Sequence, residues 1–476
     1  MEKVQIKLNE RIKQYNEHVY KALEMLYTAF SAAGHELYLV GGCVRDLLLG
    51  REPKDYDLCT DALAEDVCKI LGPHWSIIET GIKHGTVTAL LNLDGMKSVS
   101  FEITTYRIDG DYTDNRHPDT VTFVTSLEED LKRRDFTINS FAYDFIREEI
   151  NMLDKSFLKD LKLGIIKTVG KPTQRFKEDA LRMLRAIRFS AQLNFSINKE
   201  TYEAIKLNCG WMSHVSRERV RDELTKILLS DNPQRLDLFA ITGLEKYSFD
   251  GHHRPILDML TCDHESQWHY TDVFHHAIDV VKNLPKVFEL RWAGLLHDVG
   301  KPKVKKPNPR GPEGQYAYYG HQDVSAEITL QIMDILKFSN DQKNLIYTYV
   351  KYHDVELADC KKSTFKKIVA KIGVEHFVDF IKLKFADASA HKLVTDTKYA
   401  VDTIDIIKQR FGEILENNEA ITFKDLQING YDLMDIGYIG KEVGTELNNL
   451  LEYIMEYPDR NKKDHLIQKA RKDKYK

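Results

Sequence analysis

The stretch "YLVGGCVRDLLLGREPKDYDLCTDA", residues 38–62, places two glycines, a short helix-like run and two aspartates in quick succession. Gly41 and Gly42 stand between a predicted strand and a predicted helix start, where backbone N–H groups can approach a phosphate closely. On a strand, Asp55 and Asp57 would point their carboxylates to the same face. Two like charges so close are unfavourable unless a cation lies between them, and Mg²⁺ prefers such oxygen ligands. This order therefore predicts a nucleoside triphosphate that is held through Mg²⁺.

The length and composition of the chain indicate a globular protein of several domains. The chain has 476 residues, which is too many for one typical core, so two to four domains are expected. We find no apolar run of membrane-spanning length and no apolar secretory segment near the start. The six cysteines form no CxxC pair, which is typical of reduced thiols in a cytoplasmic protein.

The periodicity of apolar residues changes along the chain. Residues 10–33 have the pattern of one amphipathic helix that ends at Gly34. Short β-rich runs dominate residues 75–145, and from about residue 150 the pattern is almost wholly helical. The predicted fold class is therefore an α/β head with a mixed sheet, followed by a mostly α-helical body.

The opening stretch resembles the catalytic core of the class II tRNA nucleotidyltransferases and bacterial poly(A) polymerases. Similar blocks follow in the order of that family: "FEITTYRIDGDYTDNRHPDTVTFV", "LKRRDFTINSFAYD", "RFKEDALRMLRAIRFSAQLNF" and "SRERVRDELTKILLS". The resemblance covers roughly residues 35–245. It implies a polymerase-β-like head joined to a helical neck, body and tail.

The run "EDALR" is predicted to read the base of the nucleotide. On one helix, Asp179 and Arg182 would share a face. Aspartate only accepts hydrogen bonds and arginine only donates them, which matches the amino group and ring nitrogen of cytosine and adenine. Guanine and uracil would leave buried groups unpaired. The alternative is a surface salt bridge, and the resemblance favours base reading.

Other side chains are expected to hold the sugar and the phosphates. Arginine forms bidentate contacts with phosphate and aspartate can accept from a ribose 2′-hydroxyl, which suits Arg133, Arg134 and Asp135. The resemblance suggests Glu102 as a third active-site carboxylate, and it implies that residues 109–119 reshape the pocket between C and A addition. It further implies nucleotide contacts from Gly41, Gly42, Arg45, Asn139, Arg185 and Arg188.

The implied reaction is in-line attack of an RNA 3′-hydroxyl on the α-phosphate, with release of pyrophosphate. Mg²⁺ on Asp55 and Asp57 would activate the attacking oxygen and steady the leaving group. The implied partners are ATP, CTP and the acceptor arm and 3′ end of a tRNA, and no membrane is involved.

A second constellation lies in residues 270–390, within "VFHHAIDVV", "AGLLHDVGKP", "GHQDVSAEI", "KYHD" and "FADASA". It resembles the HD superfamily of metal phosphohydrolases. The resemblance implies one metal held by His276, His297, Asp298 and Asp387, with His321 and His353 available for a second site. Such mixed ligands suit Mg²⁺, Mn²⁺, Fe²⁺, Ni²⁺ or Co²⁺. The resemblance implies that the domain can act as a phosphatase or 2′,3′-cyclic phosphodiesterase, as in some tRNA nucleotidyltransferases, or can persist as a scaffold.

These patterns predict five segments: an N-terminal helix, a nucleotidyltransferase head, a helical neck and body, an HD metal domain, and a C-terminal body and tail. In the same order, these segments cover residues 1–34, 35–150, 151–265, 266–395 and 396–476.

The predicted function is addition of CCA to tRNA 3′ ends. One alternative is an A-adding enzyme or poly(A) polymerase; retention of residues 109–119 argues only against a CC-adding enzyme. Another is an HD phosphohydrolase with a nucleotide-sensing head, against which the intact Asp55 and Asp57 argue. A third is a non-catalytic RNA-binding protein, which would not need two sets of residues suited to bind a metal ion.

Overall fold

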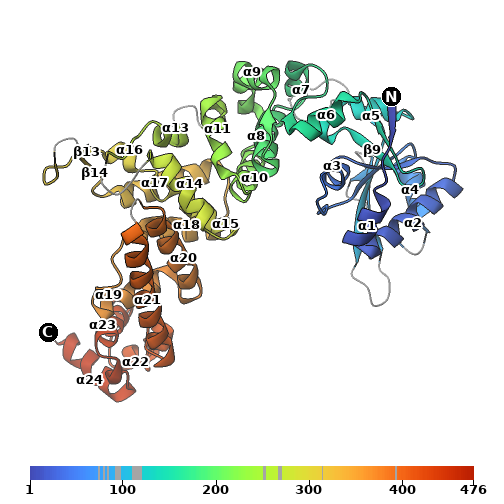
Figure 1. The fold of residues 1–476 in the computed structure, drawn as a ribbon. Helices are drawn as coiled ribbons and strands as arrows, with labels where there is room; N and C mark the ends of the chain where they lie inside the picture. The colour runs from blue at the N-terminus through green and yellow to red at the C-terminus, as the bar shows by residue number, and fades with distance from the viewer. Residues whose placement is uncertain are drawn as a thin grey trace. The chain divides into compact units, whose positions relative to one another are not determined.

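The computed structural model describes residues 1–72, 75–78, 81–82, 85–91, 98–109, 121–249, 254–265, 271–312, 315–391 and 394–475. The chain divides into two compact units, which are described separately (Figure 1). The first comprises Met1–Ile227 and Leu238–His252, and the second comprises Leu228–Asp237 and His253–Lys476.

The first unit is built on a mixed sheet of eight strands within the described ranges, which confirms the predicted α/β head. The strands lie in the order β1 (Glu2–Gln5), β10 (Glu149–Met152), β9 (Phe141–Asp144), β2 (Leu37–Val40), β3 (Asp57–Thr60), β6 (Val99–Thr105), β5 (Thr86–Leu91) and β4 (Trp75–Ile78). Strands β3 and β6 run parallel, whereas the other neighbours are antiparallel. In this register Asp57 lies opposite both Val40 and Glu102.

Two helices replace the single helix predicted over residues 10–33. Helix α1 (Asn9–Tyr15) is followed by Asn16, whose extended backbone interrupts the run. The Asn16 side chain then accepts from the N–H groups of His18 and Val19 and so caps α2 (Glu17–Ala32). The predicted N-terminal helix is also incomplete, since residues 2–5 form strand β1 of the sheet.

Helix α2 folds onto the head through one apolar face. Its buried side chains recur every three or four residues, which is the spacing that a helix needs to bury one stripe. They are Val19, Ala22, Leu23, Leu26, Tyr27 and Phe30. The central strand β2 is buried at all four positions, so the core lies around the middle of the sheet.

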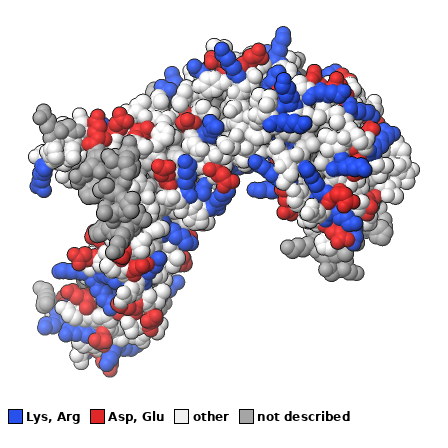
Figure 2. Space-filling view, in the orientation of Figure 1, with Lys and Arg blue, Asp and Glu red and all other residues white. Residues whose placement is uncertain are grey.

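Helices dominate the rest of the first unit, as predicted. Two short helices, α3 (Gly42–Leu48) and α4 (Ala64–Leu71), follow β2 and β3. The later ones are α5 (Leu127–Lys132), α6 (Ser156–Leu163), α7 (Pro172–Glu178), α8 (Leu181–Leu193), α9 (Lys199–Asn208), α10 (Arg217–Leu228), α11 (Asp237–Ile241) and α12 (Leu244–Ser248). Figure 2 shows many Lys and Arg side chains over the visible face of this unit.

The second unit is almost entirely helical. Its first part comprises α13 (Pro255–Leu260), α14 (Val273–Asn283), α15 (Phe288–Leu296), α16 (Lys301–Val304), α17 (His321–Ile335), α18 (Asn340–Tyr352), α19 (Lys362–Ile372) and α20 (Phe377–Ser389). A short hairpin of β13 (Lys306–Pro307) and β14 (Tyr316–Ala317) separates α16 from α17. Helix α14 packs against both α15 and α20, so residues far apart in sequence can meet between them.

The C-terminal part of this unit has a hydrophobic cluster of its own. It follows α21 (Val394–Glu416) and includes α22 (Gly430–Asp435), α23 (Lys441–Glu456) and α24 (Lys463–Lys474). Leu433, Leu450, Ile454 and Leu466 are fully buried in that cluster. A search of the described residues finds no helix with the length and apolar character needed to cross a membrane.

Candidate functional site

Three carboxylates gather at the start of β3. The parallel pairing of β3 with β6 sets Asp57 beside Glu102, and Asp55 precedes the strand by two residues. Burial raises the pKa of Asp57 to about 6; the charges of Glu102 and Asp55 add to this, against the opposing effect of Arg134. Asp55 lies outside the strand, so the prediction that one strand carries both aspartates is wrong. The oxygen donors nonetheless fit a hard divalent cation such as Mg²⁺.

Gly41 joins β2 to α3 with a left-handed backbone, at φ +73°. A Cβ atom at this position would lie 3.1 Å from Nη1 of Arg134. The glycine therefore lets the chain turn tightly against the guanidinium group of Arg134, a group that can bind phosphate.

Asp130 holds Arg133 and Arg134 in place from within the core. Its fully buried carboxylate accepts from Nε and Nη2 of Arg133, at 2.9 and 2.6 Å, and from Nη2 of Arg134 at 3.0 Å. Burial by itself would raise the pKa of Asp130, but the two guanidinium groups lower it below its usual value. Sequence reasoning missed Asp130, although it stands three and four residues before the two arginines.

Substitution of Asp130 by asparagine is expected to lower the free energy of unfolding by about 3–5 kcal/mol, because two largely buried cations would lose their anion. Urea denaturation followed by tryptophan fluorescence measures this change. Glu129→Gln, which removes an exposed ion pair with Lys132, is expected to cost only about 0–1 kcal/mol. An equal effect of the two substitutions would contradict the structural role of Asp130.

Four of the predicted nucleotide-binding residues form one hydrogen-bonded chain. Arg45 donates from Nη1 to Asn139 at 2.7 Å, and Asn139 donates to Asp135 at 3.1 Å. Arg185 binds the other oxygen of Asp135 through Nε and Nη2, at 2.9 and 2.6 Å. Although burial opposes it, the Arg185 charge and the Asn139 amide lower the pKa of Asp135 well below its usual range. The Asp135 carboxylate is thus kept ionised, as a hydrogen-bond acceptor.

Arg188 joins this group through an aromatic ring. The guanidinium carbons of Arg45, Arg185 and Arg188 lie 5.3, 5.4 and 4.2 Å from the centre of the Phe189 ring. Burial, together with the charge of Arg185, lowers the pKa of Arg188 to about 10. Glu223 on α10 offsets that cost, because its carboxylate lies 3.0 Å from Nε of Arg188.

The prediction that Asp179 and Arg182 share one helix is wrong. Helix α7 ends at Glu178, and Asp179 has an extended backbone before α8 begins. The Asp179 carboxylate accepts from both Nη atoms of Arg219, at 3.3 and 2.8 Å.

Arg182 has different partners. Its guanidinium group binds Oε2 of Glu178 at 2.5 Å and the backbone carbonyl of Arg133 at 3.0 Å. The two predicted base-reading side chains are therefore oriented by other residues rather than by each other. Residues 110–120, which include most of the segment predicted to reshape the pocket, lie outside the described residues.

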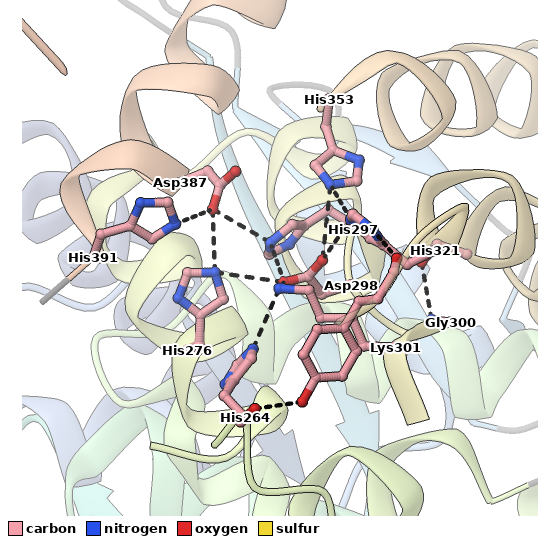
Figure 3. Close-up of polar contacts among 12 residues, drawn as sticks. His264, His276, His297, Asp298, Gly300, Lys301, His321, His353, Asp387 and His391 are labelled. Atoms are coloured by element: carbon pink, nitrogen blue, oxygen red, sulfur yellow. Dashed lines mark hydrogen bonds and ion pairs between the residues drawn. The ribbon is translucent and has the colours of Figure 1, made fainter. Parts of the chain in front are cut away.

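The second unit brings together all six predicted metal ligands (Figure 3). Helices α14 and α20 supply His276 and Asp387, whose Nε2 and Oδ1 atoms lie 3.1 Å apart. The others are His297 and Asp298 at the end of α15, His321 at the start of α17, and His353 directly after α18.

Asp298 presents its two oxygens to different histidines. Oδ2 lies 3.2 Å from Nε2 of His297, whereas Oδ1 lies 3.3 Å from Nε2 of His321 and 3.8 Å from Nε2 of His353. Burial disfavours a charged imidazole, yet Asp298 and Asp387 raise the pKa of His297 to about 10. The carboxylates therefore make this buried site attractive to positive charge.

Backbone carbonyls fix the tautomers of three histidines. Each imidazole Nδ1 lies near the carbonyl oxygen three residues earlier: Gly294 for His297 at 2.8 Å, Tyr318 for His321 at 3.0 Å, and Val350 for His353 at 2.6 Å. In the neutral form that a metal ligand adopts, with the proton on Nδ1, each Nε2 presents a lone pair to the cluster.

The Nε2 atoms of His321 and His353 lie only 3.2 Å apart. Two neutral imidazoles in this tautomer offer only lone pairs to each other. Burial lowers the pKa of His353 to about 3, which keeps that ring neutral. A bound divalent cation suits this arrangement, so the donor set fits a metal ion.

Sequence reasoning chose His276 over its neighbour His275, and the structure buries His276 whereas His275 is exposed and bonded to Asp272. It missed Lys301, whose Nζ lies 2.6 Å from Oδ2 of Asp298, and His264, which contacts the same ammonium group at 3.3 Å. The "HDVGK" spacing offered a signal for Lys301, because positions three apart meet on one helical turn.

Gly300 lets the start of α17 approach this centre. A Cβ atom here would lie 2.5 Å from the backbone nitrogen of Ser325 and 2.8 Å from the carbonyl oxygen of His321. Gly300→Ala should displace the turn that carries His321, so metal affinity is expected to fall about 10–100-fold in chelator competition. Gly412→Ala, where a Cβ meets nothing within 4 Å, should leave the affinity unchanged. Unchanged affinity in Gly300→Ala would show that α17 can shift without loss of the site.

Family models match three parts of the chain. Residues 37–167 match the poly(A) polymerase head domain, residues 194–255 match the probable RNA- and SrmB-binding site of polymerase A, and residues 269–381 match the HD domain. These matches cover the segments that the sequence predicted as the nucleotidyltransferase head and the HD domain.

The named relatives are CCA-adding enzymes. The chain is 46% identical over 228 residues to the CCA-adding enzyme of Ligilactobacillus salivarius, which covers 48% of this chain and 54% of that protein. It is 46% identical over 239 residues to that of Lactobacillus delbrueckii subsp. bulgaricus, covering 50% and 57%. The chain thus spans about half the length of the curated relatives that it matches.

Solved structures extend the likeness to almost the whole chain. The Bacillus stearothermophilus CCA-adding enzyme in complex with CTP shows a TM-score of 0.70 and 26% identity, covering 95% of this chain and 97% of that one. The chain has the fold of CCA-adding enzymes, and the resemblance predicted from the sequence is confirmed.

Proposed function

We propose that this protein adds C, C and A to tRNA 3′ ends from CTP and ATP, without a nucleic-acid template. The observation that carries the proposal is the register of β3 and β6, which sets Asp57 beside Glu102 next to the turn at Gly41. The CCA-adding enzymes among its relatives support the same assignment.

In this proposal Asp55, Asp57 and Glu102 would hold Mg²⁺, which would supply activation of the attacking hydroxyl and stabilisation of the departing pyrophosphate. Arg134, at the Gly41 turn, offers its guanidinium group to the phosphates. Asp135 is kept ionised by Arg185, so it can accept a hydrogen bond from a ribose hydroxyl.

Base selection is assigned to Asp179 and Arg182. Asp179 would accept from the exocyclic amino group of cytosine or adenine, and Arg182 would donate to the adjacent ring nitrogen. For this role the Arg182 guanidinium group must keep an N–H free of Glu178 or exchange that contact for the base. Uracil and guanine would leave these groups unpaired, which disfavours them.

The test is incubation with Mg²⁺, labelled CTP or ATP, and tRNAs that lack CCA, end in C, or end in CC. Products that stop after the terminal A on all three would support CCA addition. Addition of A only to the CC-ending tRNA would indicate an A-adding enzyme, and long A tails would indicate a poly(A) polymerase. No incorporation at all would overturn the proposal.

Arg219 is expected to contribute to selectivity because it orients the Asp179 carboxylate with two hydrogen bonds. Arg219→Gln should lower the preference for CTP over UTP about 10-fold or more, since hydrogen bonds to charged groups contribute about 1.5–3 kcal/mol. Single-nucleotide incorporation with each triphosphate measures the ratio. Arg221→Gln, two residues further along the same helix, removes a contact to Asp222 and should preserve the ratio. Equal loss of CTP and UTP incorporation in Arg219→Gln would instead indicate a structural role.

A second activity is favoured by the facing Nε2 atoms of His321 and His353. We propose that the HD domain binds a divalent metal through its six predicted ligands and hydrolyses a phosphate ester, with metal-activated water as the nucleophile. Hydrolysis of a phosphate monoester and of a 2′,3′-cyclic nucleotide in the presence of Mg²⁺, Mn²⁺, Fe²⁺, Ni²⁺ or Co²⁺ tests this. Metal binding without turnover of either ester would leave the domain as a scaffold.

A further inference from the structure

His391 lies one helical turn beyond Asp387, at the end of α20. The helix ends at Ser389, but the backbone keeps a helical turn: Ala390 N–H donates to Asp387 O at 3.0 Å and His391 N–H to Ala388 O at 3.4 Å. Residues four apart on such a turn present their side chains to the same side. His391 therefore faces the same centre as Asp387 (Figure 3).

Three imidazole nitrogens converge on one oxygen of Asp387. Nε2 of His276 lies 3.1 Å from Oδ1, Nε2 of His297 lies 3.6 Å from it, and Nε2 of His391 lies 3.7 Å from it. The ligand atoms of His276, Asp387 and His391 all lie within 4.8 Å of one another. Metal–nitrogen and metal–oxygen bonds of about 2.0–2.2 Å place neighbouring ligand atoms roughly 3–3.5 Å apart. Small side-chain adjustments would thus bring His391 into the coordination shell.

We infer that His391 is an additional ligand of the HD metal centre, on the ion shared by His276 and Asp387. The inference rests on the proposed metal centre. It adds a residue outside the set that the sequence pattern predicted, because the "HD" dipeptide and its spaced histidines do not include it.

His391 differs from the other histidines of the site in exposure. Its side chain is 29% exposed, whereas His276 and His297 are each 1% exposed. A ligand on the solvent side can be removed without opening the core of the domain. His391 also stacks on His276, with ring centres 5.6 Å apart and planes at 22°. Packing alone is thus the competing explanation, and a substitution can separate the two roles.

The experiment compares two substitutions in the full-length chain with Co²⁺ as the probe. His391→Ala removes both the nitrogen and the ring, whereas His391→Phe keeps a ring that can stack on His276 but cannot bind metal. Coordination by His391 predicts that both variants lose at least about 10-fold in Co²⁺ affinity and that their visible absorption bands shift. His275→Ala serves as the control, because this exposed histidine on α14 pairs with Asp272 instead.

The outcomes separate the inference from the metal centre itself. If wild-type protein binds Co²⁺ and His391→Phe matches it in affinity and spectrum, His391 is a packing residue and the inference is overturned. If wild-type protein binds none of Mg²⁺, Mn²⁺, Fe²⁺, Ni²⁺ and Co²⁺ in this domain, the proposed metal centre fails and the inference fails with it. Weaker binding in both His391 variants, with His275→Ala unchanged, supports coordination.

Discussion

Asp57→Asn is expected to reduce incorporation of CTP into tRNA lacking CCA by about 1,000-fold or more. Asparagine keeps the shape of the side chain but removes the charge proposed to hold Mg²⁺, and metal stabilisation of such a transition state is worth several kcal/mol. The initial rate of label incorporation at saturating Mg²⁺ measures the loss.

Stability gives an internal control for this prediction. Burial and the neighbouring carboxylates raise the pKa of Asp57, so its ionised form destabilises the metal-free head above that pKa. Asp57→Asn removes this charge, and its melting temperature is therefore expected to equal or exceed that of wild type. Asp66→Asn, on the exposed face of α4 beside Lys69, should retain full activity. An active Asp57→Asn protein would exclude the proposed role of this carboxylate.

Asp298→Asn is expected to abolish tight metal binding in the HD domain and to lower phosphate-ester hydrolysis about 1,000-fold. The reason is that both Asp298 oxygens face histidines, Oδ2 toward His297 and Oδ1 toward His321, so one substitution weakens the whole set. Elemental analysis of dialysed protein measures the bound metal.

Addition of nucleotides to tRNA should persist in Asp298→Asn, because the head carboxylates belong to the other unit. Asp279→Asn provides the matched control: this exposed aspartate on α14 pairs with Lys282 and should keep its metal. Full metal content in Asp298→Asn would refute the assignment of Asp298 as a ligand.

The sequence predicted best where function depends on local spacing. Gly41 is close in sequence to Asp57, and His297 is adjacent to Asp298. The local helices and strands therefore largely determine the arrangement within each pair. The alternation between sheet and helix likewise predicted the mixed head and the helical body, because strand and helix periodicities differ clearly.

The sequence predicted less well where a polar side chain interrupts a helical pattern. Asp179 accepts the N–H of Leu181 at 3.1 Å, an aspartate turn that starts α8 and breaks the expected helix. Asn16 does the same before α2. Neither site contains glycine or proline, so the apolar pattern seemed continuous. Asparagine and aspartate are favoured at helix starts, which is the signal that could have revealed both breaks.

Partners distant in sequence were not predictable. Arg219 binds Asp179 across 40 positions, and His264 meets Lys301 across 37. Such pairs depend on how helices pack, which no local pattern of the sequence encodes.

The clustered carboxylates of the head are also expected to discriminate between the ligands that approach them. Asp57 lies beside Glu102, and burial raises its pKa, with the negative charges of Glu102 and Asp55 adding to the effect. A bare nucleoside triphosphate would bring several more negative charges toward this cluster and would be repelled. A triphosphate that already carries its cation would be attracted instead. The head should therefore discriminate between free and metal-complexed nucleotide before any base is read, so that an unproductive ligand rarely occupies the site.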